Sequence, residues 1–259
     1  MTLKVFSWNV NGLRAQAKKG FLSWLDACQG DVVFVQEVKA QEEQLEDNKL
    51  KDFRNYKGYW HTGQKKGYSG VGLYTKLPIG NKDVIRGIGL SEFDDEGRVI
   101  GLKFKSLVLF GCYFPNSQAE GKRLDFKLRF CDALLKKAMS YIESGCKVII
   151  SGDLNIAHKE IDLARPESNH TSPGFLPEER AWFTKALCHG FYDAFRLFNQ
   201  EPNNYTWWSL RTRARERNIG WRIDTQLVSK NAKDFIVSSN IHNDVLGSDH
   251  CPISIEINH

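Results

Sequence analysis

Several short apolar runs of the sequence lie next to side chains that can bind a divalent cation or move a proton. These side chains are Asn9, Glu37, Asp153 with Asn155, and the pair Asp249-His250. Carboxylate and amide oxygens are ligands that Mg²⁺ prefers, and a carboxylate or an imidazole can also act as an acid or a base. If the runs are strands whose ends meet at one edge of a sheet, the sequence predicts a site for metal-assisted hydrolysis.

Asp153 and Asn155 follow the apolar run at residues 148–151. Residues i and i+2 of an extended segment point to the same side, so these two side chains are expected to project together. The carboxylate can take a proton from water, and the amide can orient that water or a phosphate oxygen. The same Gly-Asp-x-Asn sequence is also typical of a turn, which is the alternative interpretation.

Glu37 and His250 offer the other two groups that such chemistry needs. Glu37 follows the apolar run at residues 32–36 and is either a Mg²⁺ ligand or a simple end to a strand. His250 can bind a phosphate oxygen or shuttle a proton near neutral pH, whereas a surface histidine beside a capping Asp249 is the alternative. A partner carboxylate would orient the imidazole, and Asp224 is the best candidate because an acid within an apolar strand needs a partner of its own.

Positive charge is concentrated in residues 205–222. The chain has 36 Lys and Arg against 31 Asp and Glu, a net charge of +5. This segment alone holds Arg211, Arg213, Arg215, Arg217 and Arg222 against one acid, Glu216. Interleaved tryptophans (Trp207, Trp208, Trp221) could stack on bases or sugars, so the segment favours nucleic-acid binding over a solvated basic helix beside core tryptophans.

The elements that must position these residues are strands mixed with helices. Runs rich in Val, Ile, Phe and Tyr predict strands at residues 3–8, 32–36, 71–74, 99–104, 107–113, 148–151, 223–228 and 253–257. Helical periodicity covers residues 122–142, and a helix is expected at 178–189 after Pro177. The pattern favours an α/β fold of packed layers, and no linker divides residues 1–259, which are expected to form one domain.

Cysteine usage and the N-terminus bear on the compartment. The six cysteines form no C-x-x-C pair and mostly lie among apolar residues, which indicates reduced, buried thiols. No secretory signal or membrane span is present in the sequence. A soluble, intracellular protein is expected.

Taken in order, these motifs resemble a known family. They are residues 7–14, 36–39, 67–71, 113–116, 152–158, 174–177, 205–208, 220–224 and 247–252. The set closely resembles the exonuclease III family of abasic-site (AP) endonucleases, from about residue 3 to about residue 257. Each motif is weak alone, but the whole series in register makes a chance match very improbable.

The resemblance implies a four-layered α/β sandwich, with two mixed β-sheets packed face to face and helices outside. It implies hydrolysis of the phosphodiester 5′ to an abasic site, with Mg²⁺ as cofactor and Mn²⁺ as an alternative, leaving a 3′-hydroxyl. It also implies accessory 3′-phosphodiesterase or 3′→5′ exonuclease activity. The partner would be double-stranded DNA with abasic sites or blocked 3′ ends, bound by a monomer that is located with the chromosome in the cytoplasm.

The resemblance also implies roles for individual residues. Asn9 and Glu37 would hold the metal, with Asp153, Asn155, Asp249 and His250 as further ligand candidates. Asp153 would deprotonate the attacking water and Asn155 would orient it. His250, oriented by Asp224, would bind a phosphate oxygen. Tyr113 would contact the scissile phosphate or assist the leaving oxygen, and Asp249 matches a position linked to a second metal or the leaving group.

Contacts with the DNA are implied for a larger set. Trp207, Trp221 and Ile223 would wall the pocket for an extruded abasic sugar. The positions that match DNA-contact regions are Arg14, Lys18, Lys19, Tyr68, Asn116, Asn169 and Ser172, and those that match wedges into the duplex are Gln118 and Arg211. Asn11 stands where some relatives carry an acid, which would weaken a second metal site. The alternatives are another phosphoesterase of the same fold and a non-catalytic DNA-binding module.

Overall fold

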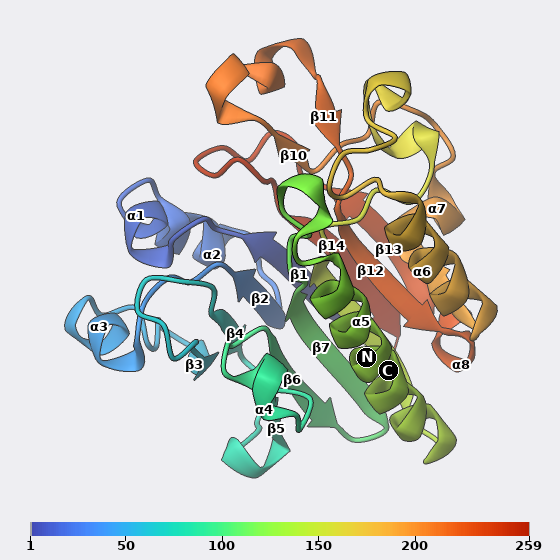
Figure 1. Ribbon diagram of the computed structural model, residues 1–259. Helices are drawn as coiled ribbons and strands as arrows, with labels where there is room; N and C mark the ends of the chain where they lie inside the picture. The colour runs from blue at the N-terminus through green and yellow to red at the C-terminus, as the bar shows by residue number, and fades with distance from the viewer. Residues whose placement is uncertain (1, 259) are drawn as a thin grey trace.

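The computed structural model describes residues 2–258, and two six-stranded β-sheets form its centre (Figure 1). In spatial order, the first sheet consists of β13 (Ile236–Ile241), β14 (Ile253–Asn258), β1 (Thr2–Asn9), β2 (Val32–Gln36), β4 (Val71–Thr75) and β3 (Lys57–His61). The second consists of β5 (Val84–Arg86), β6 (Val99–Phe104), β7 (Leu107–Tyr113), β8 (Lys147–Asp153), β12 (Asp224–Ser229) and β9 (Phe191–Asp193). A short separate hairpin pairs β10 (Trp207–Trp208) with β11 (Gly220–Trp221).

Each large sheet mixes parallel and antiparallel pairs. β1 runs parallel to β2, and β7 runs parallel to β8, whereas the neighbouring pairs are antiparallel. The carboxyl ends of β1 and β2 therefore lie at one edge of their sheet, and those of β7 and β8 lie together at one edge of theirs. The strand topology therefore brings together the polar residues that end or follow these strands.

The two sheets pack face to face through an apolar core. One buried cluster joins Val5 and Phe34 of the first sheet to Leu109 and Ile149 of the second. Gly111 on β7 allows the close approach, because a Cβ there would lie 2.1 Å from the ring of Phe34. The branched and aromatic residues of the strands thus face each other between the sheets, as expected for a sandwich.

Helices cover the outer faces (Figure 1). The long helices α5 (Leu124–Glu143) and α6 (Pro177–Cys188) pack on the second sheet, while α1 (Leu13–Ala17), α2 (Phe21–Ala27) and α3 (Glu42–Asp47) flank the first. The remaining helices are α4 (Ser91–Asp94), α7 (Ala194–Phe198) and α8 (Lys230–Lys233). Short 3₁₀ helices lie at Asn81–Asp83, Ala119–Gly121, Glu160–Asp162, Pro166–Ser168, Leu210–Thr212 and Ala214–Arg217.

This architecture confirms the expected fold class. Each predicted strand and both predicted helices are present, with shifts of a few residues at their ends. Sequence patterns did not detect the short strands β3, β5, β9, β10, β11 and β13, nor the helices of seven residues or fewer. Cys112, Cys131, Cys146 and Cys251 are buried free thiols, as predicted. Within residues 2–258, no helix has the length and apolar character that crossing a membrane requires.

Candidate active site

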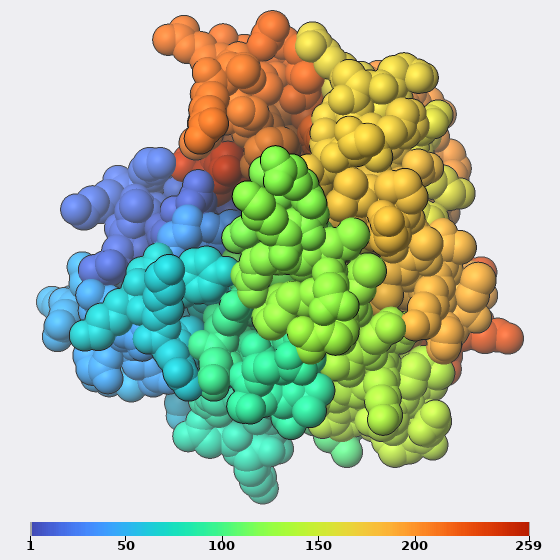
Figure 2. All heavy atoms as spheres, in the orientation of Figure 1, coloured from blue at the N-terminus to red at the C-terminus, as the bar shows by residue number. Residues whose placement is uncertain are grey.

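A pocket of about 460 Å³ opens where the strand ends of both sheets converge. In Figure 2, red atoms from near the C-terminus are visible in a hollow between the orange segment, the blue segment and the green loop. Glu37 directly follows β2, Tyr113 ends β7 and Asp153 ends β8. The other predicted site residues that line the pocket are Asn116, Asn155, Asn169, Ser172, Trp207, Trp221, Ile223, Asp249 and His250.

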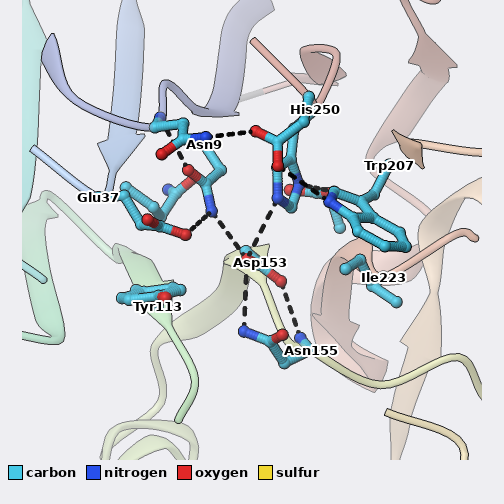
Figure 3. Close-up of polar contacts among 12 residues, drawn as sticks. Asn9, Glu37, Tyr113, Asp153, Asn155, Trp207, Ile223 and His250 are labelled. Atoms are coloured by element: carbon cyan, nitrogen blue, oxygen red, sulfur yellow. Dashed lines mark hydrogen bonds and ion pairs between the residues drawn. The ribbon is translucent and has the colours of Figure 1, made fainter. Parts of the chain in front are cut away.

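Glu37, Asp153 and His250 form the centre of the pocket (Figure 3). One ligand atom from each lies within 4.8 Å of the others, so among the described residues they form a group that could hold a metal ion. Asn9, the last residue of β1, is buried and donates from Nδ2 to Glu37 Oε1 at 2.9 Å and to Asp153 Oδ2 at 2.9 Å. Asn9 thus bridges the two carboxylates and holds them side by side.

Asp153 carries a perturbed carboxyl group. It is 1% exposed, and its burial raises its pKa; the nearby carboxylates of Asp224 and Glu37 raise it further, against the lowering effect of His250. Three carboxylates near one imidazole make a site with excess negative charge. Such an excess of hard oxygen donors fits Mg²⁺ or a similar divalent cation.

His250 is paired with Asp224, as the sequence predicted. The Nδ1 atom of His250 lies 2.9 Å from Asp224 Oδ2, and its Nε2 atom lies 3.8 Å from Asp153 Oδ2. Asp224 and Asp153 are cross-strand partners on β12 and β8, which brings both carboxylates beside one ring. Burial alone would lower the pKa of His250, but the carboxylates of Asp224 and Asp153 outweigh it and raise this pKa.

Asp153 and Asn155 come together through a turn rather than through the extended segment that the sequence predicted. Asn155 has φ +51°, and its backbone N–H donates to Asp153 Oδ1 at 2.9 Å. Its Nδ2 donates to Phe114 O at 3.0 Å, and Asn116 Nδ2 donates to Asn155 Oδ1 at 3.2 Å. The turn and the site, treated as alternatives from the sequence, are therefore one structure.

Left-handed backbone recurs at this edge. Glu37 has φ +53° and Asn11 has φ +46°, as well as Asn155. Non-glycine residues in this region are strained and persist where surrounding contacts hold them, often at functional sites. Glu37 and Asn155 line the pocket, whereas Asn11 lies in the groove beside it.

Lys39 is a residue that the sequence reasoning did not single out. Its Nζ lies 2.6 Å from Glu37 Oε2 and donates to Asn11 Oδ1 at 2.6 Å. Burial raises the pKa of Glu37, but this ammonium and the amide of Asn9 outweigh it, so the pKa of Glu37 is lowered. The signal in the sequence that could have pointed to Lys39 is its position two residues after Glu37, an acid able to bind a metal.

Asp249 lies beside the central group but is held separately. Trp207 Nε1 donates to its Oδ2 at 3.1 Å, and Asn11 Nδ2 donates to its Oδ1 at 2.9 Å. Burial would raise the pKa of Asp249, but His250 and these two N–H donors lower it. Both oxygens of this carboxylate already accept hydrogen bonds, and Asp249 is outside the group of three that could hold a metal.

Tyr113 lines the pocket beside Glu37 (Figure 3). The guanidinium of Arg98, which is buried, lies 4.8 Å from the centre of its ring. Burial raises the pKa of Tyr113 well above its ordinary value, and the carboxylates of Glu37 and Asp153 add to this. The phenol therefore stays protonated near neutral pH and is a hydrogen-bond donor.

Aromatic and aliphatic side chains form the opposite wall. Trp207 and Trp221 are cross-strand partners on β10 and β11, and their rings pack edge to face, with centres 6.4 Å apart at 84°. Both pack on an apolar cluster that contains Phe175 and Ile223. The pocket thus combines an acidic centre with an apolar wall, which suits a small sugar beside a phosphate.

The arginines of residues 205–222 do not form one patch. Arg222 is 2% exposed and is ion-paired with Asp162 and Asp193, so its predicted place in a DNA-facing patch is wrong. Arg215 lies 4.5 Å from the Trp208 ring and donates to backbone carbonyls of Asn243, Val245 and Ser248. Arg211, Arg213 and Arg217 are exposed beside the pocket.

The remaining predicted contact residues lie around the pocket. Arg14, Lys18 and Lys19 line a neighbouring groove together with Asn11 and Lys39. The hydroxyl of Tyr68 accepts hydrogen bonds from Arg98 and Arg123. Gln118 precedes the 3₁₀ helix Ala119–Gly121 on a loop, with φ +60°.

Comparisons with known proteins agree with this geometry. The sequence profile of the Endonuclease/Exonuclease/phosphatase family matches residues 6–250. The chain is 44% identical over 259 residues to an exodeoxyribonuclease of Bacillus subtilis, covering 99% of this chain and 100% of that protein. It is 38% identical over 256 residues to the DNA repair nuclease APEX1 of Danio rerio, covering 98% and 81%. The crystal structure of an AP endonuclease from Leishmania major superposes with a TM-score of 0.89 at 30% identity, covering 100% of this chain and 88% of the other.

Proposed function

The chain belongs to the Endonuclease/Exonuclease/phosphatase family, and from this premise we propose how it acts on DNA. It is a DNA-repair AP endonuclease that hydrolyses the phosphodiester 5′ to an abasic site and leaves a 3′-hydroxyl. Exonuclease and phosphodiesterase activity at 3′ ends uses the same centre, and residues 1–259 act as one catalytic domain. The observation that carries the proposal is one pocket in which Glu37, Asp153 and His250 face a wall of Trp207 and Trp221.

Mg²⁺ is the cofactor that we propose, with Mn²⁺ as an alternative. Glu37 and Asp153 are the carboxylates that would hold it, with Asn9 and Asn155 beside them and Asp249 as an outer neighbour, whereas the neighbouring His250 is left to bind the phosphate. The fit rests on the geometry, because ligand atoms of the Glu37 and Asp153 carboxylates lie within 4.8 Å of each other. A bound divalent cation supplies the positive charge that offsets charge building on the phosphoryl oxygens.

Asp153 is the general base in this mechanism. Its raised pKa brings the carboxylate close to neutral pH, where a base is most effective. Asn155, fixed by its turn and by Phe114 O, orients the attacking water toward the phosphorus atom. Holding the water in line converts a bimolecular attack into a positioned one.

His250 and Tyr113 stabilise the phosphate. With its raised pKa, His250 is an imidazolium that donates from Nδ1 to Asp224 and from Nε2 to a phosphate oxygen. Tyr113 stays protonated and donates its hydroxyl hydrogen to the phosphate or the leaving oxygen. Donors aimed at developing negative charge in a buried site stabilise the transition state strongly.

The wall of Trp207, Trp221 and Ile223 receives the abasic sugar once it leaves the helix. Extrusion costs little where the base is already lost, which favours abasic over intact nucleotides. Asn116, Asn169 and Ser172 at the rim, with Arg14, Lys18 and Lys19 in the adjacent groove, contact the DNA strands. The substrates proposed are duplexes with abasic sites or blocked 3′ ends, bound by one copy of the chain inside the cell.

The test uses a labelled duplex with one tetrahydrofuran abasic analogue, which cannot undergo β-elimination. The protein is incubated with it in Mg²⁺ and, separately, in EDTA, and an undamaged duplex of the same sequence is the control. A nick on the 5′ side that needs Mg²⁺ supports the proposal. Binding without a nick would instead support a DNA-binding module. Neither binding nor nicking, with turnover of a small phosphoester, would support another phosphoesterase of this fold.

A further inference from the structure

Behind the pocket lies a buried ion pair that the mechanism above does not use. Lys127 on α5 and Glu179 on α6 are both 0% exposed, and Lys127 Nζ lies 2.5 Å from Glu179 Oε1. A charge is almost never buried this completely unless partners satisfy it. Besides their contact with each other, Lys127 and Glu179 each have further hydrogen-bond partners.

Each member of the pair also binds a loop that lines the pocket. Lys127 Nζ donates to the backbone carbonyl of Asn155 at 2.7 Å. Glu179 Oε1 accepts from Ser117 Oγ at 2.6 Å, next to the pocket residue Asn116. Glu179 Oε2 accepts from the backbone N–H groups of Gly174 at 2.6 Å and Leu176 at 3.0 Å.

The loops that contain Ser117, Asn155 and Gly174 meet at the side-chain amide of Asn155. Asn155 has φ +51°, a conformation that needs support from its surroundings. Asn116 Nδ2 donates to Asn155 Oδ1. Gly174 packs so closely that a Cβ there would lie 3.3 Å from the backbone oxygen of Asn155 and 3.4 Å from the Trp221 ring. A single lysine–glutamate pair therefore fixes the backbone of Asn155 and the loop that supports one wall tryptophan.

A purely stabilising role does not account for this arrangement. Taking two charges out of water is costly, and apolar side chains often replace a buried ion pair without loss of stability. Apolar side chains cannot, however, donate to the Asn155 carbonyl or accept from Ser117, Gly174 and Leu176. What only the charged pair can supply is the geometry of the pocket loops.

We propose that Lys127 and Glu179 are positioning residues for incision, which hold the water-orienting amide of Asn155 and the loop at residues 172–176 in their working geometry. This inference rests on the proposed function, because it assigns the pair a part in that reaction. Neither side chain touches the DNA. They act through Asn155 and the pocket loop.

The test is a double-mutant cycle between Lys127→Met and Asn155→Ala. In single-turnover nicking of the tetrahydrofuran duplex, Lys127→Met should lower the rate by about 30-fold, since small displacements of a positioning group cost up to about 10². Affinity for the uncut duplex in EDTA should change by less than about threefold. In the Asn155→Ala background the same substitution should have almost no further effect on the rate. An unchanged rate, or an equal loss in both backgrounds, would overturn the inference.

A matched control is present on the same two helices. Lys185 on α6 is ion-paired with Asp132 on α5 at 2.7 Å, and neither binds a pocket loop. The variant Lys185→Met with Asp132→Asn removes that pair but keeps an acceptor for Trp182 Nε1, so it should nick at the wild-type rate. If Lys127→Met does not fold, Glu179→Gln enters the same cycle, because one amide oxygen cannot replace two carboxylate oxygens.

Amide hydrogen exchange separates this inference from the proposed function. In Lys127→Met, exchange at residues 153–156 and 172–176 should be at least about tenfold faster than in wild type, and the control variant should leave it unchanged. Should the wild-type protein fail to nick, the proposed function falls, while unchanged exchange would independently refute the positioning role.

Discussion

Two buried charge clusters lie two residues apart on the chain, one at Arg222 and one at Asp224. In the first, Arg222 pairs with Asp162 and Asp193, and Arg196 pairs with Asp162, at nitrogen–oxygen distances of 2.6 to 2.8 Å. Positive and negative charges balance. Burial would raise the pKa of Asp162, but Arg222 outweighs it and lowers that pKa to about 2.

The cluster at Asp224 is not balanced. Glu37, Asp153 and Asp224 surround the single imidazole of His250, and the ammonium of Lys39 contacts one oxygen of Glu37 and the side chain of Asn11. Here burial and neighbouring acids raise the pKa of Asp153 instead of lowering it.

The difference separates structural from catalytic use of the same residue types. A balanced cluster is strongly destabilising to break, because removal of one partner leaves an uncompensated buried charge. An unbalanced one is held in place by the rest of the fold and retains affinity for a cation and for protons. Burial alone, which both clusters share, does not distinguish them.

The largest expected effect is on catalysis. Asp153→Asn removes the general base, so single-turnover nicking should fall by about 10³-fold, or roughly 4 kcal/mol of activation free energy. The free energy of unfolding should stay the same or rise, because a repelled buried carboxylate is lost. Urea unfolding of the same sample measures this, and a clear loss of stability would show that the cluster is structural after all.

Breaking the balanced cluster should instead lower the stability of the protein. Arg222→Met leaves Asp162 and Asp193 buried with less compensation, so the free energy of unfolding should fall by about 3–5 kcal/mol. Arg211→Met, an exposed arginine of the same segment, is the control and should change it by less than about 0.5 kcal/mol. Equal effects of the two substitutions in urea unfolding would contradict the distinction.

Metal should stabilise only through the unbalanced cluster. At a Mg²⁺ concentration about 100 times the Kd, the free energy of unfolding should rise by about 2.7 kcal/mol. Glu37→Gln should abolish this increment. Arg222→Met should retain it, although its free energy of unfolding without metal is lower than that of the wild type. Thermal unfolding with and without EDTA gives the comparison, and an increment that survives in Glu37→Gln would place the ion elsewhere.

The smallest expected effect is the pH dependence of the metal-free protein. Because the pKa of Asp153 is raised from 3.8 to about 7, the folded state keeps a proton that the unfolded chain releases. The contribution of Asp153 to stability should therefore fall as pH rises between about 5 and 6, by at most about 1.4 kcal/mol per pH unit. Burial lowers the pKa of His158 to about 4, so His158 contributes a rise over the same window, and the change in slope on replacing Asp153 is the quantity to measure. The pKa of His250 is raised, so His250 contributes mainly above this window.

Asp162 gives the opposite sign in a different window. Its pKa is lowered to about 2, so its contribution is present above about pH 4 and is lost as pH falls toward 2. Asp153→Asn should make the slope between pH 5 and 6 more positive, by at most about 1.4 kcal/mol per pH unit, without altering the loss of stability at acid pH. A slope identical to that of the wild type would show that Asp153 does not titrate in this window.

Much of the fold and the site could be predicted because the signals were local. Apolar runs marked the strands, with β2, β6 and β7 at their observed bounds, and polar residues at strand ends marked Glu37 and Asp153. The Asp224–His250 pair could be predicted because an acid in an apolar strand needs a partner. The short helices carry too few turns for a periodicity to be seen.

What could not be predicted depended on partners far along the chain. Arg222 appeared to belong to an exposed basic segment because Asp162, its partner, is 60 residues away. Lys127 looked like any lysine of an amphipathic helix, and only its contact with Glu179 explains its burial. Whether a charge is exposed, balanced or unbalanced is decided by tertiary packing, which composition does not contain.

The pairing of β1 with β14 has a consequence for how the chain folds. Trp8 Nε1 donates to His250 O across 242 residues; Asn9 is the last residue of β1, and His250 lies just before β14. Contacts of such long sequence separation close late, because a large loop must be ordered before they form. Partly folded chains should therefore be catalytically silent, and the recovery of nicking on refolding should track the slowest phase of structure formation.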